Sequence, residues 1–157
     1  MDTKRRDLLK TGSGLSMLAL VAAAGWLKPD DAFAADWNKA AFDTKTVDDT
    51  VKALGGNSAV QSKDISFVST PDIAENGAVV PIGVSSSIPK TESIAILVEK
   101  NPNTLAASFD IPAGTEPAIT TRIKMGQTSN VYALVKADGK YYMTSKEIKV
   151  TLGGCGG

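Results

Sequence analysis

The stretch Ala118-Ile119-Thr120-Thr121-Arg122-Ile123-Lys124-Met125 places apolar residues (Ile119, Ile123, Met125) between polar ones (Thr120, Arg122, Lys124). Successive side chains of a β-strand point to opposite faces of the sheet, so this pattern predicts a strand with one buried face and one wet face. Near the end of the sequence, Ile148, Val150 and Leu152 alternate in the same way with Glu147, Lys149 and Thr151. These stretches indicate a β domain whose sheets have a solvated side.

Outward from this stretch, short runs rich in Val, Ile, Thr, Tyr and Phe recur from residue 64 onward, separated by turn residues. They predict strands at 64–69, 78–88, 93–99, 104–111, 118–125, 131–136 and 141–152. Asn76-Gly77 and Asp138-Gly139 are predicted tight turns, because both residue types tolerate the positive φ that hairpin turns require. Pro81 lies inside one run and predicts an edge position or a bulge there, since proline has no N–H to donate.

One segment, residues 37–54, has helical character. Val47, Val51 and Leu54 fall on one face, and Gly55-Gly56 follow as a C-terminal stop, so one or two short helices should open the domain. The whole pattern fits a mainly β fold, an immunoglobulin-like antiparallel β-sandwich with a short N-terminal helical segment. A small barrel would give a similar pattern and stays open on these grounds alone.

The first 34 residues are interpreted as an export signal. A basic start with paired Arg5 and Arg6 precedes the apolar run 15–25, which is about half the ~20 apolar residues that a spanning helix needs. The arginine pair resembles the twin-arginine (Tat) type, with leucine where that consensus prefers phenylalanine. Ala32-Phe33-Ala34 supplies a small-x-small cleavage site, so the mature chain is expected to begin near residue 35, without a membrane anchor and in the periplasm.

Composition excludes several classes of function. The chain of 157 residues carries 17 basic and 17 acidic residues, and this balance gives no basic patch for nucleic-acid binding. It contains no histidine, which removes His-dependent catalytic triads, c-type haem attachment and most zinc or copper sites. We therefore expect no metal, no cofactor and no catalysis by the domain alone.

Cys155 is the sole cysteine and stands between two glycine pairs, Gly153-Gly154 and Gly156-Gly157. Glycines lack a Cβ atom, so this backbone is expected to form a thin, flexible arm over 153–157 that can enter a narrow slot. An unpaired exposed cysteine in an oxidising compartment is a liability unless it is used. The sulfur is therefore interpreted as the working atom of a carrier domain at 35–152, presented to other proteins and activated mainly by them.

At Gly153-Gly154-Cys155-Gly156-Gly157 the chain resembles the SoxY family, the sulfur-carrier subunits of the bacterial thiosulfate-oxidising Sox system. The twin-arginine leader, the Leu54-Gly55-Gly56 helix end and the β-sandwich agree with this resemblance. It implies a heterodimer with SoxZ. It also implies that the cytochrome SoxXA joins thiosulfate to Cys155, that the hydrolase SoxB releases sulfate and leaves a persulfide, and that the sulfane dehydrogenase SoxCD acts where present.

Three other interpretations remain open. A ubiquitin-like sulfur carrier would bear a thiocarboxylate on Gly157, which the leader and the position of Cys155 disfavour. A structural or interaction sandwich module would use Cys155 only for intermolecular disulfides. An enzyme could rest on Asp48 and Asp49, but no nucleophile or base stands at a recognisable spacing from them. Either the core or an interface with SoxZ would suit the apolar residues Ile119, Ile123, Met125, Tyr141 and Tyr142, and the core is the more common place for such residues.

Overall fold

The computed structural model describes residues 38–151 of the chain. Contacts between residues divide the chain into two units, Met1–Trp37 and Asn38–Gly157, and every described element belongs to the second. Its helices are α2 (Lys39–Phe42) and α3 (Val47–Ala53). Its strands are β1 (Ala59–Gln61), β2 (Ile65–Val68), β3 (Ile73–Ala74), β4 (Val80–Ser86), β5 (Thr91–Val98), β6 (Leu105–Asp110), β7 (Ala118–Ile123), β8 (Ser129–Ala137) and β9 (Lys140–Val150).

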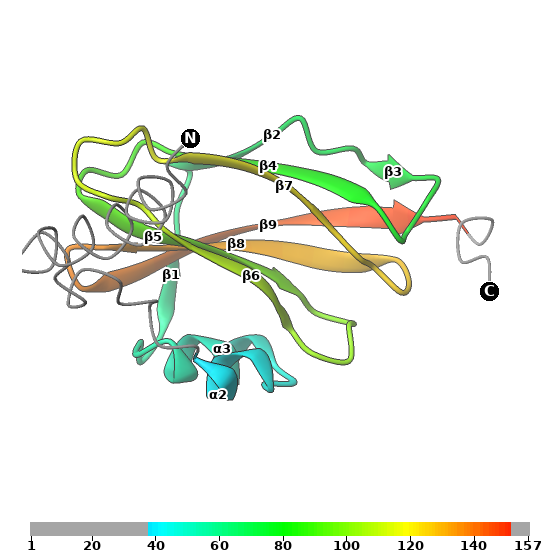
Figure 1. Ribbon diagram of the computed structural model, residues 1–157, viewed down its shortest axis with the longest axis horizontal. Coiled ribbons are helices and arrows are strands. Elements are labelled where there is room, and N and C mark those ends of the chain that lie inside the picture. The colour runs from blue at the N-terminus through cyan, green and yellow to red at the C-terminus, as the bar shows by residue number, and fades with distance from the viewer. Residues whose placement is uncertain (1–37, 152–157) are drawn as a thin grey trace, which may run out of the picture. The chain divides into compact units, whose positions relative to one another are not determined.

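The strands form two sheets that face each other, and this confirms the predicted β-sandwich (Figure 1). The larger sheet has the order β1-β9-β8-β5-β6, with β3 also paired to β9, and the smaller has the order β2-β4-β7. Between them lies an apolar core to which β4, β5 and β8 contribute most; its fully buried members include Ile82, Ile96 and Val135. Met125 and Ile123 of the opening stretch are buried in this core, as expected.

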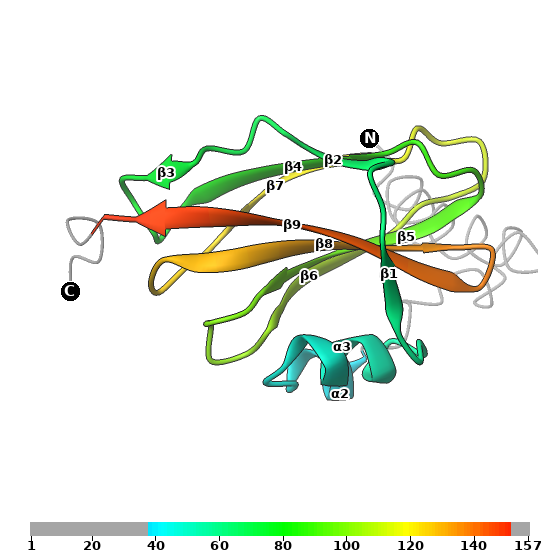
Figure 2. The same ribbon diagram turned by 180° about the vertical axis from the view of Figure 1, so that it is seen from behind.

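The two helices cover the outer face of the larger sheet, where a second apolar cluster forms (Figures 1 and 2). It joins Ala41 and Val51 of the helices to Leu97, Leu134 and Tyr141 of the sheet. Because β5 is covered on both faces, its residues from Ile94 to Val98 are all buried. That strand therefore lacks the alternation seen in β7, as expected for a strand with no wet face.

Local signals explain how α3 begins and ends. The Thr46 hydroxyl accepts a hydrogen bond from the Asp49 amide (3.1 Å), which is the usual N-terminal cap. At the other end Gly55 has φ +95°, and the amides of Gly55 and Gly56 donate to Lys52 O and Val51 O, both at 2.9 Å. This is a Schellman motif, and it confirms Gly55-Gly56 as the predicted helix stop.

The turn predictions have mixed outcomes. Asp138 and Gly139 both have positive φ and join β8 to β9 in a two-residue hairpin, as predicted. Asn76-Gly77 also forms a turn, but the prediction of a hairpin with positive φ was wrong there, because the turn leads from β3 in one sheet to β4 in the other. The Asn76 side chain accepts a hydrogen bond from the Ala78 amide (2.9 Å) and stabilises that turn.

Pro81 occupies a strand that is central in its sheet but locally unpaired on one side. β4 pairs with β7 at residues 80–85, whereas β2 pairs with it only at residues 83–86. The predicted edge position of Pro81 was wrong, because β4 is the central strand of its sheet. Proline is tolerated there because β2 does not extend to residue 81, so the missing N–H removes no bond to that strand.

Candidate functional site

The residues predicted to bind sulfur, to form the flexible tail, to signal export and to mark the cleavage site all lie outside the described part of the chain. These residues are Cys155 with Gly153, Gly154, Gly156 and Gly157, together with Arg5, Arg6, Ala32 and Ala34. The structure describes instead the part of the domain that carries Cys155, which is the end of β9 up to Thr151. We call the last three described residues, Lys149 to Thr151, the root of the tail.

Hydrogen bonds donated by its own backbone amides hold the root on both sides. On the side of β3, the Lys149 amide donates to Asp72 O (2.9 Å) and the Thr151 amide donates to Ala74 O (3.1 Å). On the opposite side, the Val150 amide donates to the hydroxyl of Thr128 (3.0 Å). The fixed part of the chain therefore extends to Thr151, and Cys155 follows only four residues later.

Close packing reinforces these bonds. Gly77 lies so near the root that an added Cβ atom would be 2.8 Å from Val150 Cγ1 and under 3.0 Å from the carbonyl oxygen of Met125. The Met125 amide also donates to Gly77 O (2.7 Å). This turn, the start of the β7–β8 loop and the root thus form one packed unit, in which only glycine fits at position 77.

The surface next to the root carries exposed apolar and charged groups. Ile73 of β3 is 56% exposed, and Val79 just before β4 is 49% exposed. Lys149, Lys124 and Glu75 are exposed as well, and none of these three takes part in an ion pair within residues 38–151. The surroundings of the root are therefore open to a second protein.

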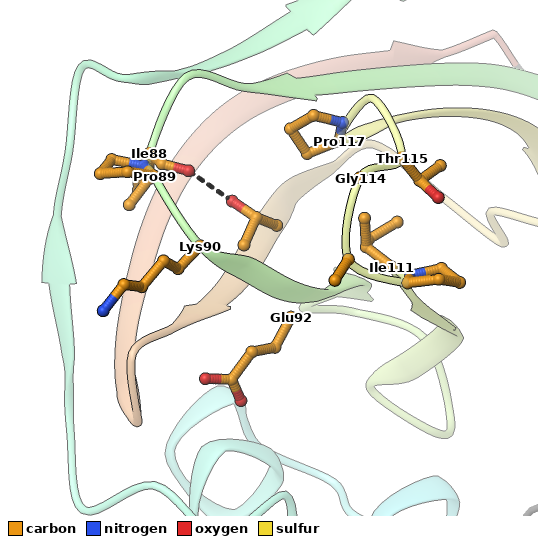
Figure 3. A pocket seen from close by; sticks show the side chains of 11 residues that line it. Ile88, Pro89, Lys90, Glu92, Ile111, Gly114, Thr115 and Pro117 are labelled. Atoms are coloured by element: carbon orange, nitrogen blue, oxygen red, sulfur yellow. Dashed lines mark hydrogen bonds between the residues drawn. The ribbon is translucent and has the colours of Figure 1, made fainter.

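A groove of about 550 Å³ lies at the opposite end of the sandwich, between the loops that precede β5 and β7 (Figure 3). Ile88, Pro89, Ile111 and Pro112 give it apolar walls, and the Thr91 hydroxyl donates to Ile88 O (2.8 Å). The groove has no thiol or imidazole in its lining. It is separate from the root, which is built from the other end of β9.

Glu92 and Lys136 are titratable groups that shift each other's pKa. The pKa of Glu92 lies below its ordinary value, chiefly through a hydrogen bond from Lys136 and then through the Gly139 amide. The same contact raises the pKa of Lys136, so the two shifts describe one ion pair of 3.0 Å. Asp48 and Asp49 are exposed in the first turn of α3, where their negative charges interact favourably with the positive end of the helix dipole.

Within 38–151, no three His, Cys, Asp or Glu side chains are grouped so that they could hold a metal ion. In the same range, no helix has the length and hydropathy needed to cross a membrane.

Sequence reasoning missed two short strands, of which β3 holds the root. β1 and β3 both pair in parallel with the free edge of β9, at residues 141–143 and 149–150 respectively. Three and two residues are too short to show a period, so the only usable signal for β3 is the pair Ile73-Ala74 before the Asn76-Gly77 turn.

Comparison with known proteins identifies the family. The family model described as sulfur oxidation protein SoxY matches residues 50–155, a range that includes Cys155. The solved structure of the sulfur carrier protein SoxY from Chlorobium limicola f thiosulfatophilum is similar, with 37% identity and a TM-score of 0.58. The match covers 66% of this chain and 96% of that one.

A superoxide reductase (neelaredoxin) from Ignicoccus hospitalis is similar at 19% identity and a TM-score of 0.48, over 55% of this chain and 79% of that one. A search of curated proteins found no match. The family match and the identity to the Chlorobium carrier cover most of the described domain, and the chain therefore belongs to the SoxY family of sulfur oxidation proteins.

Proposed function

We propose that the protein carries sulfur covalently on Cys155 Sγ while partner enzymes oxidise it. The observation that carries this proposal is the family match, which reaches through the described domain to Cys155 itself. The hydrogen-bonded root supports it, because a cysteine four residues beyond a fixed strand end can be presented to another protein by a domain that stays folded.

Two balanced steps describe the loading and first release. The Cys155 thiolate and thiosulfate join through a new S–S bond and give up two electrons to an oxidising cytochrome, which leaves Cys–S–S–SO₃⁻. Water then attacks the terminal sulfur, sulfate and two protons leave, and Cys155 keeps a persulfide, Cys–S–S⁻. The thiolate is the reacting form of cysteine in the first step, and persulfides are among its known oxidised states.

The carrier contributes attachment rather than catalysis in this scheme. An intermediate that stays tethered meets each enzyme at high effective concentration and is not lost to solution. Lys149 is the nearest basic residue in sequence before Cys155, six positions away, so activation of the thiol is assigned to the partners.

The partners and the compartment are part of the same proposal. Membership of the family supports a heterodimer with SoxZ and successive encounters with SoxXA, SoxB and, where present, SoxCD. Arg5, Arg6 and the Ala32 to Ala34 cleavage region support export by the twin-arginine pathway to the periplasm.

The test is thiosulfate-dependent cytochrome reduction in a reconstituted system. Cys155→Ser should abolish it. A second variant, Cys155→Ser with Ser145→Cys, moves the thiol to an exposed position on β9, where it can still form disulfide dimers but has no tail to enter a recessed site. Inactivity of both variants fits the carrier. Full activity of Cys155→Ser would end the proposal, and activity of the moved thiol would show that the tail is not required.

A further inference from the structure

The distance between the fixed domain and Cys155 is limited by the chain. Cys155 is four positions after Thr151 in the sequence. A fully extended chain spans at most about 3.3–3.6 Å per residue, so the two Cα atoms are at most about 14 Å apart. When an enzyme takes the cysteine sulfur into a recessed active site, part of this length of tail lies inside the entrance to that site. Its outer surface must then touch the domain around Thr151.

The structure defines what such an enzyme would touch. Thr151 is held against β3 by the bond from its amide to Ala74 O, and the neighbouring Ile73 is paired in register with Lys149. Paired residues lie on the same face of a sheet, so Ile73 and Lys149 stand side by side. Both are exposed.

A second exposed apolar side chain follows the adjoining turn. The Val79 amide donates to Asn76 O (3.3 Å), and Gly77 inside that turn packs on Val150. Among residues 38–151, the large hydrophobic side chains that remain exposed are Val60, Val68, Ile73 and Val79. Two of these four therefore belong to the short segment 73–79 that packs against the root. Contact with water does not stabilise apolar side chains, so their grouping there indicates a surface that another protein covers.

We propose that the exposed side chains near Thr151, which are Ile73 and Lys149 side by side and Val79 after the adjoining turn, together form the docking surface for the enzymes that process sulfur on Cys155. We call it the root surface. Its occupant is an enzyme with a recessed active site and an apolar rim at its entrance, and each such enzyme covers it in turn. The inference rests on the proposed carrier function.

The small number of exposed apolar side chains at the root surface suits a transient encounter. A carrier must leave each enzyme after reaction, and transient complexes bury less area than permanent ones. Ile73 and Val79 can supply the few central contacts that dominate such interfaces. The charged groups Lys149, Lys124 and Glu75, which have no ion pairs within the described residues, are available for a polar rim.

The experiment compares Ile73→Lys and Val79→Lys with Val60→Lys in the heterodimeric carrier. Val60 is also exposed (61%), but it lies on β1 beside Tyr142, near the start of β9 and away from the root. Carriers loaded as the S-thiosulfonate are given to the sulfate-releasing hydrolase. Each root variant should lower kcat/KM about tenfold or more through KM, which corresponds to about 1.4 kcal/mol of lost binding, and Val60→Lys should match the unmodified protein.

A longer tail separates docking from a general structural defect. Roughly six Gly/Ser residues inserted between Thr151 and Leu152 add up to about 20 Å of reach, so the sulfur can enter an enzyme without contact at the root. The defect of Ile73→Lys should shrink in this background. An equal defect in both backgrounds would overturn the proposal, as would normal processing of both root variants or loss of the heterodimer in them.

The carrier function itself has a separate control in these assays. Labelling of Cys155 by a small alkylating reagent, and loading with thiosulfate, should be the same in all variants. If the unmodified protein failed to load, the proposed function would be wrong. If it loaded normally and the root variants were processed normally, only the docking inference would be wrong.

Discussion

Substitution of Gly77 by alanine should destabilise the protein, because the new methyl group has no space. It would lie 2.8 Å from Val150 Cγ1 and under 3.0 Å from the backbone oxygen of Met125, which is fully buried and cannot move away cheaply. Overpacking of this kind costs about 1–3 kcal/mol. Weakening of the Met125 N–H to Gly77 O bond would add about 1 kcal/mol, and the lower entropy of the unfolded alanine chain would offset about 0.4–1 kcal/mol.

The expected loss in the free energy of unfolding is therefore about 2 kcal/mol. Urea denaturation measures it, with the midpoint falling and the slope unchanged. Gly126→Ala is the matched control in the neighbouring β7–β8 loop, since an added Cβ there meets nothing within 4 Å and the residue has no positive φ. Hydrogen exchange at the amides of Val150 and Thr151 should speed up only in Gly77→Ala. Equal stability of the two variants would refute the packing argument at the root.

Three further predictions concern other parts of the molecule. Tyr141→Phe removes the hydroxyl that donates to Leu54 O and ties α3 to the sheet, so the free energy of unfolding should fall by about 1 kcal/mol; an unchanged urea midpoint would contradict this. The pKa of Glu92 is lowered by Lys136, so the ionised Glu92 stabilises the folded state. This contribution is complete above the pKa that Glu92 has in the unfolded chain, and it is lost as the pH falls through the lowered pKa of the folded state. Acid titration of Glu92→Gln should accordingly show less loss of stability than the unmodified protein, and identical acid profiles would be evidence against the ion pair. Replacement of Arg5-Arg6 by two lysines should keep the precursor in the cytoplasm, which cell fractionation would show; unchanged export would argue against the twin-arginine pathway.

The alternation of apolar and polar residues was sufficient to predict the strands that have one solvent-exposed face. Thr120 and Arg122 of β7 are exposed while Ile123 is buried, because the strand lies on the smaller sheet with solvent on its outer side. The apolar run of β5 was also found, although burial on both faces removes its alternation. The preferences of glycine and aspartate for positive φ located the helix stop at Gly55-Gly56 and the β8–β9 hairpin at Asp138-Gly139.

The missed features are those that depend on distant partners. β3 consists of Ile73 and Ala74, and it is a strand only because β9, more than 70 residues later, offers a free edge. The need for glycine at position 77 likewise comes from Met125 and Val150, not from positive φ. The sequence therefore predicted the sandwich, but not how the root of the tail is fixed, and the role of Cys155 stays a prediction.

Intact-protein and peptide mass spectrometry tests the central claim most directly. The mature carrier is incubated with thiosulfate and its oxidising cytochrome, then with the sulfate-releasing hydrolase. The account predicts a thiosulfate adduct on Cys155 that becomes a persulfide after hydrolysis, is removed by a thiol reductant and is absent from Cys155→Ser. An adduct on the Gly157 carboxylate, or no adduct on Cys155 under turnover, would contradict it.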